Sequence, residues 1–164
     1  MAAPTIEKAE TVRDLPDLKA TEALAAALAG VIRPGDVIAL SGELGSGKTT
    51  FARALIGAMA DRLHIPREEV PSPTFTLVQA YEFPGLPVWH FDLYRLKRPE
   101  DAYELGIEEA FANAACLVEW PERLGSLLPP ERLDVRLDFT NHEKRRARLS
   151  GSGNWAARIG ALRG

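Results

Sequence analysis

A glycine-rich octapeptide at residues 42–49 constrains the fold of this chain more than any other feature. It reads Gly-Glu-Leu-Gly-Ser-Gly-Lys-Thr and fits the pattern G-x-x-x-x-G-K-[ST] of a phosphate-binding loop. In such a loop the glycines let successive backbone N–H groups turn towards a phosphate. The helix that follows adds the partial positive charge of its N-terminus. The pattern therefore predicts an α/β domain in which a strand leads into the loop and a helix leaves it.

The residues on either side of the loop supply this setting. Residues 36–41 form a short apolar run that is typical of a strand buried on both faces of a parallel sheet. After the loop, apolar residues recur every four positions, which predicts a helix with one buried face: Phe51, Leu55, Met59 and Leu63. This order favours a functional phosphate-binding loop over a purely structural glycine turn.

The rest of the chain alternates between predicted strands and predicted helices. We predict further strands over residues 5–15, 74–83, 88–92, 115–119, 132–139 and 146–150. Further helices are expected over about residues 17–32, from Pro99, over 121–128 and from Trp155 to Leu162. The chain has 164 residues and shows no repeat or linker. We therefore predict one domain, residues 1–164, with a P-loop NTPase-like three-layer α/β fold around a central mixed, mainly parallel sheet.

The composition and charge argue against several classes of function. The formal net charge is -3, which argues against a domain that grips DNA or other nucleic acid through its phosphates. The densest basic cluster is Arg145, Arg146 and Arg148, which we interpret as a solvated strand face. The sequence shows neither a signal peptide nor about 20 consecutive apolar residues, so we expect a cytoplasmic protein without a membrane role. Cys116 lies in an apolar segment and is expected to be buried and unreactive.

Two carboxylates that follow apolar strands are expected to complete a site for ATP and Mg²⁺. Lys48 can reach the β and γ phosphates and the Thr49 hydroxyl can bind Mg²⁺, with Thr50 as the alternative ligand. We assign Asp92 to Mg²⁺ and Glu119, a second candidate metal ligand, to positioning or deprotonating the attacking water. The predicted catalytic residues are Lys48, Asp92 and Glu119, and the predicted metal ligands are Thr49, Asp92 and Glu119. The predicted nucleotide-binding residues are Gly42, Glu43, Leu44, Gly45, Ser46, Gly47, Lys48, Thr49, Thr50 and Thr74.

Thr74 and Thr76 follow a proline-rich break at residues 71–73. In nucleotide switches a loop threonine contacts Mg²⁺ and the γ-phosphate, but two threonines at the start of a strand fit this segment equally well. Guanine-specific switches carry an Asn-Lys-x-Asp motif, whereas residues 141–144 read Asn-His-Glu-Lys, which favours ATP.

Four motifs, taken in order, resemble the TsaE family, the ATPases of bacterial threonylcarbamoyladenosine synthesis in tRNA. They are residues 42–50, 72–75 (Ser-Pro-Thr-Phe), 90–95 (His-Phe-Asp-Leu-Tyr-Arg) and 118–120 (Val-Glu-Trp), and the resemblance covers roughly residues 10–140. It implies a P-loop fold that binds ATP and Mg²⁺ and hydrolyses ATP slowly. It also implies two protein partners, TsaD and TsaB, whose complex modifies tRNA and is reset by the ATPase, so that tRNA is contacted only indirectly.

The resemblance also carries roles for single residues. It implies that Lys48 and Thr49 hold phosphate and Mg²⁺, that Thr74 lies in a switch-like loop and that Asp92 lies near the metal. It places Glu119 and Trp120 at the catalytic and partner-facing edge, and it gives no firm role to Tyr94 and Arg95. The tail from residue 141 to 164 carries no motif of the family.

Two other functions fit a phosphate-binding loop. A small-molecule kinase is one, although such kinases bring several arginines into a mobile lid, and here Arg95 and Arg98 are the nearest candidates. The second is a protein-binding module in which the nucleotide acts only as a conformational signal. Phosphate transfer to an acceptor, or binding without phosphate release, would distinguish these functions from hydrolysis.

Overall fold

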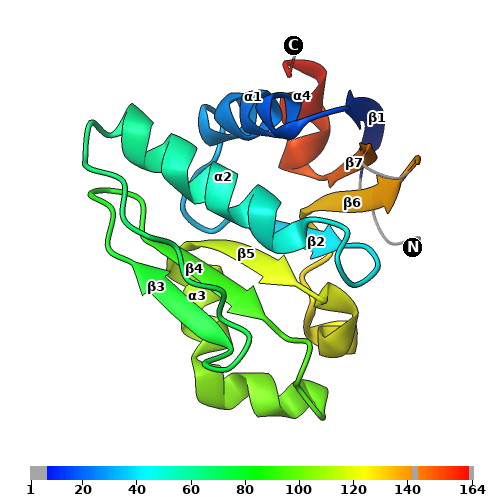
Figure 1. Cartoon of the computed structure of the whole chain (residues 1–164). Coiled ribbons are helices and arrows are strands. Elements are labelled where there is room, and N and C mark those ends of the chain that lie inside the picture. Colours follow the sequence, from blue (N-terminus) through cyan, green and yellow to red (C-terminus); the bar gives the residue numbers. More distant parts are fainter. Residues whose placement is uncertain (1–6, 142–143, 163–164) are drawn as a thin grey trace.

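The computed structural model describes residues 7–141 and 144–162, whose centre is one seven-stranded sheet (Figure 1). The strand order is β1-β7-β6-β2-β5-β4-β3. The strands are β1 (Lys8–Leu15), β2 (Val37–Ser41), β3 (Val78–Tyr81), β4 (Val88–Asp92), β5 (Ala115–Glu119), β6 (Leu133–Phe139) and β7 (Arg145–Ser152). The predicted strand over residues 5–15 thus starts outside the described residues.

The sheet is mixed, as predicted, and its parallel part lies at the centre. β2 pairs in parallel with β5 and β6, and β5 pairs in parallel with β4. The outer pairs, β1 with β7, β6 with β7 and β3 with β4, are antiparallel. The expectation of a mainly parallel sheet therefore holds for the central strands, while antiparallel pairs make up both edges.

Helices cover both faces of the sheet, which gives the predicted three layers (Figure 1). The α-helices are α1 (Leu18–Ala29), α2 (Lys48–Arg62), α3 (Ile107–Asn113) and α4 (Asn154–Gly160), and two 3₁₀ helices are η1 (Pro99–Leu105) and η2 (Pro121–Leu127). The core on one face joins α1, α2 and α4 to the sheet. The core on the other face joins α3, η1 and η2 to it.

Strand alternation decides which side chains face α2. On β5, Ala115 and Leu117 belong to the core beneath α2, whereas Cys116 and Val118 belong to the opposite core. The same period of two continues to Glu119, which therefore faces α2 at the end of the strand. On β4, Val88 faces α2 and Phe91 faces away, so His90 and Asp92 also share the α2 side.

The strand predicted over residues 74–83 is shorter than expected. Residues 73–77 form a turn in which the Leu77 N–H donates to the Pro73 carbonyl at 2.6 Å, and β3 begins only at Val78. Leu77 has a φ of 68°, in the left-handed region that interrupts an extended strand. Thr74 and Thr76 thus lie in a loop and not on a strand.

The helix predicted from Pro99 is divided into two pieces. Gly106 has a φ of 80° and separates η1 from α3. In the part of the chain that the structure describes, no helix combines the length and the apolar character that crossing a membrane requires.

Helix α4 packs closely on β7 at Gly151, and we expect Gly151→Ala to lower the free energy of unfolding by about 1–3 kcal/mol. A Cβ atom there would lie 2.6 Å from Ile159 Cδ1 and 2.7 Å from the Trp155 carbonyl oxygen. Gly160→Ala is the matched control, because a Cβ at that position meets nothing within 4 Å. Urea denaturation of both variants measures the difference, and equal stabilities would contradict this account of the packing.

Candidate functional site

The glycine-rich loop connects β2 to α2 and takes up backbone conformations that suit glycine. Gly42, Gly45 and Gly47 have φ values of 139°, 79° and 104°. Helix α2 begins at Lys48 with Gly47 at its N-cap, so no capping side chain covers the N–H groups of its first turn. These groups and the helix dipole favour an anion at this point.

Lys48 is a buried cation whose direct partners are neutral. Its Nζ donates to the carbonyls of Gly42 and Glu43, each at 2.8 Å, and it lies 4.2 Å from the centre of the Trp120 ring. Only 5% of the residue is exposed. Burial lowers the pKa of Lys48, while the nearby Glu119 acts against that shift. A buried ammonium held by neutral groups is well suited to an anionic ligand.

Thr49, Glu119 and His90 form one hydrogen-bonded chain across α2, β5 and β4. The Thr49 hydroxyl donates to Glu119 Oε1 at 2.8 Å. His90 Nε2 lies 2.6 Å from Glu119 Oε2, and the His90 and Glu119 side chains are 0% and 2% exposed. Thr50 is exposed, so Thr49 is the threonine that faces the carboxylates.

Asp92 is the direct neighbour of Glu119, because β4 and β5 pair in parallel with these two residues in register. Its Oδ2 accepts a hydrogen bond from the Thr74 hydroxyl at 3.1 Å, and its Oδ1 accepts one from the Tyr94 N–H at 3.1 Å. The loop that carries Thr74 therefore touches the carboxylate that was predicted to bind Mg²⁺. Thr76 is exposed, which distinguishes the two threonines of this loop.

A cavity of about 340 Å³ joins these groups. Most of the predicted site residues line it, together with four that were not predicted as ligands: Leu44, Gly45, Gly47, Lys48, Thr49, Thr50, Thr74, Asp92 and Glu119, and then Tyr94, Arg95, Trp120 and Arg145. Gly42, Glu43 and Ser46 are not part of this lining, but they supply the oxygens that hold Lys48. Most of the predicted site residues thus line the cavity, and the other three hold the Lys48 side chain in place.

The solvated face predicted for Arg145, Arg146 and Arg148 is wrong for Arg145. Arg146 and Arg148 are exposed, and Arg146 pairs with Asp14 at 2.9 Å. Arg145 is half-buried, and its Nε donates to the Ser46 carbonyl of the phosphate loop at 2.8 Å. The tail therefore contributes to the site, a contact that follows from strand pairing and that no local motif predicted.

Trp120 follows Glu119 in a strained backbone conformation. Its φ and ψ are 59° and 52°, a left-handed conformation that costs a bulky side chain free energy. The centre of its ring lies 5.0 Å from that of the Tyr94 ring, and the Lys48 ammonium lies over the same Trp120 ring. The end of β5 thus places a carboxylate and an aromatic ring on successive residues.

The oxygens of this cavity fit Mg²⁺ that arrives with a nucleotide. Within residues 7–141 and 144–162, no group of three or more His, Cys, Asp or Glu side chains could hold a metal ion by itself. Mg²⁺ is usually bound through one or two carboxylates, waters and substrate phosphates. Thr49, Asp92 and Glu119 offer a donor set of this kind beside the phosphate loop.

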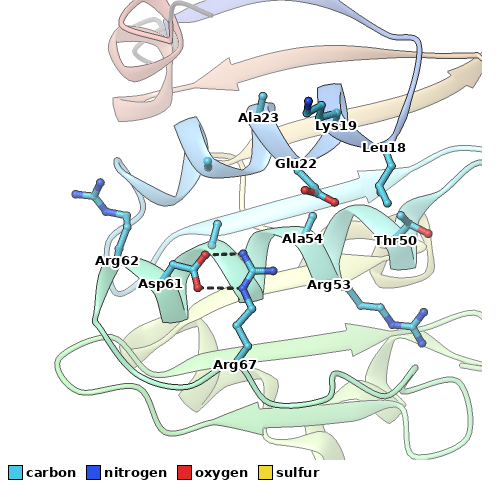
Figure 2. A pocket seen from close by; sticks show the side chains of 12 residues that line it. Leu18, Lys19, Glu22, Ala23, Thr50, Arg53, Ala54, Asp61, Arg62 and Arg67 are labelled. Atoms are coloured by element: carbon cyan, nitrogen blue, oxygen red, sulfur yellow. Dashed lines mark hydrogen bonds and ion pairs between the residues drawn. The ribbon is translucent and has the colours of Figure 1, made fainter.

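A larger hollow, of about 700 Å³, lies elsewhere, along the outer face of α1 and α2 (Figure 2). Arg67 forms two hydrogen bonds to Asp61, from Nε to Oδ1 and from Nη2 to Oδ2. Arg53 donates to the Val70 carbonyl at 2.8 Å. Alanines of the two helices also line it, among them Ala23 and Ala54. Three of its charged groups, Arg53, Asp61 and Arg67, are thus engaged with one another or with backbone, and we interpret it as a helix-packing groove.

Comparison with known proteins gives one consistent result. The family model "Threonylcarbamoyl adenosine biosynthesis protein TsaE" matches residues 15–147. A TsaE protein of Rickettsia felis is 41% identical over 125 residues, 76% of this chain and 71% of that protein. A TsaE protein of Bacillus subtilis is 38% identical over 135 residues, 82% of this chain and 81% of that protein. The crystal structure of YdiB from Bacillus subtilis is similar at a TM-score of 0.73 and 29% identity, over 98% of this chain and 97% of that one.

Cys116 lies on β5 but on the face away from α2, and we expect it not to react in the folded protein. It is fully buried, and burial raises the pKa of its thiol to about 12. Because the thiolate is the reactive form, the buried thiol should react very little at pH 8. Titration with a thiol-specific disulfide reagent should find no reactive thiol before guanidinium is added and one per chain afterwards. Rapid reaction of the native protein would contradict the burial of this residue.

Proposed function

Since the chain belongs to the TsaE family, we propose that it acts in threonylcarbamoyladenosine synthesis in tRNA as a slow, Mg²⁺-dependent ATPase. One observation carries the chemical part of this proposal. Lys48, Thr49, Asp92 and Glu119 converge on a single cavity beside a complete phosphate-binding loop. A lysine, a hydroxyl and two carboxylates in this arrangement are the kinds of group that hydrolysis of a nucleoside triphosphate uses.

Each residue has a role that its surroundings support. Lys48 and the first N–H groups of α2 would hold the β and γ phosphates. Thr49 and Asp92 would hold Mg²⁺, which neutralises charge on the phosphates in reactions of this class. Glu119, next to both, would orient the attacking water or accept its proton. Thr74 would connect its loop to this site through Asp92.

Hydrolysis is favoured over phosphate transfer by the positions of the two nearest arginines. Arg98 pairs with Asp101 at 3.1 Å and is not part of the cavity lining. Arg95 lines the cavity, but its guanidinium lies 4.6 Å from the centre of the exposed Phe75 ring. A kinase lid would bring several arginines over the transferred phosphate.

Partner binding at the mouth of the cavity is supported by exposed apolar side chains. Leu44, Phe75 and Tyr94 are 71%, 81% and 42% exposed, and they belong to the phosphate loop, the Thr74 loop and the segment after β4. Exposed apolar groups gathered around a polar site are typical of protein interfaces. We infer that TsaD and TsaB are the partners, that tRNA is reached through them, and that hydrolysis resets their complex.

The net charge agrees with this division of tasks. A chain with a formal net charge of -3 is poorly suited to gripping tRNA by itself, whereas a protein partner can supply that contact. The proposal also includes a location in the cytoplasm. It treats residues 1–164 as one ATPase domain.

Phosphate release from Mg-ATP, measured for the chain alone and then with TsaB and TsaD added, tests the proposed function. We expect slow release by the chain and strong stimulation by the pair. Lys48→Ala and Asp92→Ala should each reduce the stimulated rate by at least about a hundredfold, since each removes a charge next to the phosphates. Lys8→Ala, on the exposed edge strand β1, is the matched control and should keep the wild-type rate.

Other outcomes of this assay distinguish the two alternatives. Transfer of phosphate to an added acceptor would identify a kinase. Nucleotide-dependent binding to the pair without phosphate release would identify a binding module. Full activity of Lys48→Ala would contradict the assigned site.

The contact from β7 to the phosphate loop should also affect nucleotide binding. Arg145→Ala removes a hydrogen bond to the Ser46 carbonyl, so we expect ATP to bind about five- to tenfold more weakly, as the loss of about 1 kcal/mol predicts. Arg146→Ala, at the next position on the same strand, should leave the affinity unchanged. Equilibrium titration with a fluorescent ATP analogue compares the two variants, and equal affinities would contradict a role for Arg145.

A further inference from the structure

The carboxylate of Glu119 is held from two sides. Its Oε1 accepts a hydrogen bond from the Thr49 hydroxyl at 2.8 Å, and its Oε2 lies 2.6 Å from His90 Nε2. A carboxylate only accepts hydrogen bonds, so the imidazole donates its Nε2–H to it. His90 is 0% exposed and lies behind Glu119 as seen from the cavity, whose lining includes Glu119 but not His90.

This arrangement determines how Thr49 presents its hydroxyl. A hydroxyl has one proton and two lone pairs. When the proton of Thr49 is directed to Glu119, its lone pairs point elsewhere and are available to a cation. A Glu119 side chain that turned away would leave this proton without a fixed direction, and the hydroxyl would be a poorer metal ligand.

We propose that His90 is a positioning residue that holds Glu119 in place and, through Glu119, orients the Thr49 hydroxyl for Mg²⁺. The inference rests on the proposed function, since it concerns the metal that accompanies the nucleotide. Groups that support metal ligands from behind are known to affect metal affinity strongly, and removing one typically costs about 10- to 100-fold.

The surroundings of His90 argue against a purely structural role. Its neighbours on β4 are Trp89 and Phe91, and both belong to or pack against the apolar core of the opposite face. Within the described residues its Nδ1 is buried and has no hydrogen-bond partner. A buried polar atom without a partner costs about 1–3 kcal/mol, so an apolar residue would serve packing better. Among the residues that the structure describes, the contact that explains a histidine here is its bond to Glu119.

Two amide variants of similar chemistry test the proposal. In His90→Gln the side-chain nitrogen lies about as far from the backbone as Nε2 and can still donate to Glu119. In His90→Asn the nitrogen lies near the position of Nδ1 and cannot reach Glu119. The measurement is the affinity for ADP, by calorimetry, in excess EDTA and over a series of Mg²⁺ concentrations, with folding checked by circular dichroism.

The expected result is a difference between the variants that appears only with metal. His90→Asn should require at least about tenfold more Mg²⁺ than the wild type to reach its tight-binding form, while its affinity for ADP in EDTA stays within about twofold. His90→Gln should recover most of the difference. Equal Mg²⁺ requirements for wild type and His90→Asn would overturn the inference, as would an equal loss in both variants.

A measurement on the unaltered chain covers the case in which the variants do not fold. With ¹⁵N-labelled histidine, the NMR signal of the His90 Nε2–H should shift when Mg²⁺ is added to the ADP-bound chain, and it should shift little when ADP is added alone. An unchanged signal on addition of Mg²⁺ would overturn the proposal. A wild-type chain that binds no nucleotide under any condition would instead overturn the proposed function, and this inference with it.

Discussion

The parallel pairing of β5 with β2 on one side and β4 on the other is the constraint on which the rest of the site depends. It aligns Leu40, the residue before the last of β2, with Glu119, and it aligns Glu119 with Asp92. Parallel strands end at the same edge of a sheet, so the phosphate loop after β2 and the two carboxylates meet there without any long side chain spanning a gap. A shift of one residue in either pairing would place a carboxylate on the opposite face of the sheet, in the other apolar core.

The same arrangement gathers four buried polar groups in one place, at a cost in stability. Lys48, His90, Asp92 and Glu119 are each at most 5% exposed. Burying ionisable groups is unfavourable unless they are paired and hydrogen-bonded. Here the hydrogen bonds come from neighbouring residues of the site itself. Glu119 is bonded on both oxygens, Asp92 on both of its own, and Lys48 is held by carbonyls of the loop. The two apolar cores beneath and above the sheet supply the compensating burial.

Much of this could be predicted from the sequence, and the reasons are physical. The phosphate loop is a local pattern with local consequences, and the carboxylates were found because an apolar run followed by Asp or Glu indicates the end of a buried strand. The period of two also places His90 on the same face as Asp92. Its pairing with Glu119 could not be predicted, since that depends on the register of β4 with β5. The extent of β3 was overestimated, because the left-handed conformation of Leu77 is set by the turn at Pro73 and not by the preference of Thr and Phe for strands.

Arg145 shows where sequence reasoning reaches its limit and why the tail matters to the site. Strand β7 is antiparallel to β6, and β6 lies beside β2, so a residue about a hundred positions after the loop returns to it through two strand pairings. Its contact with the Ser46 carbonyl adds a second anchor to the loop, besides the bonds that Lys48 makes to the carbonyls of Gly42 and Glu43. The close packing of α4 on β7 at Gly151 fixes the strand that carries this arginine. The segment without recognisable motifs therefore acts on the phosphate loop through the geometry of the sheet, which a comparison of motifs alone does not detect.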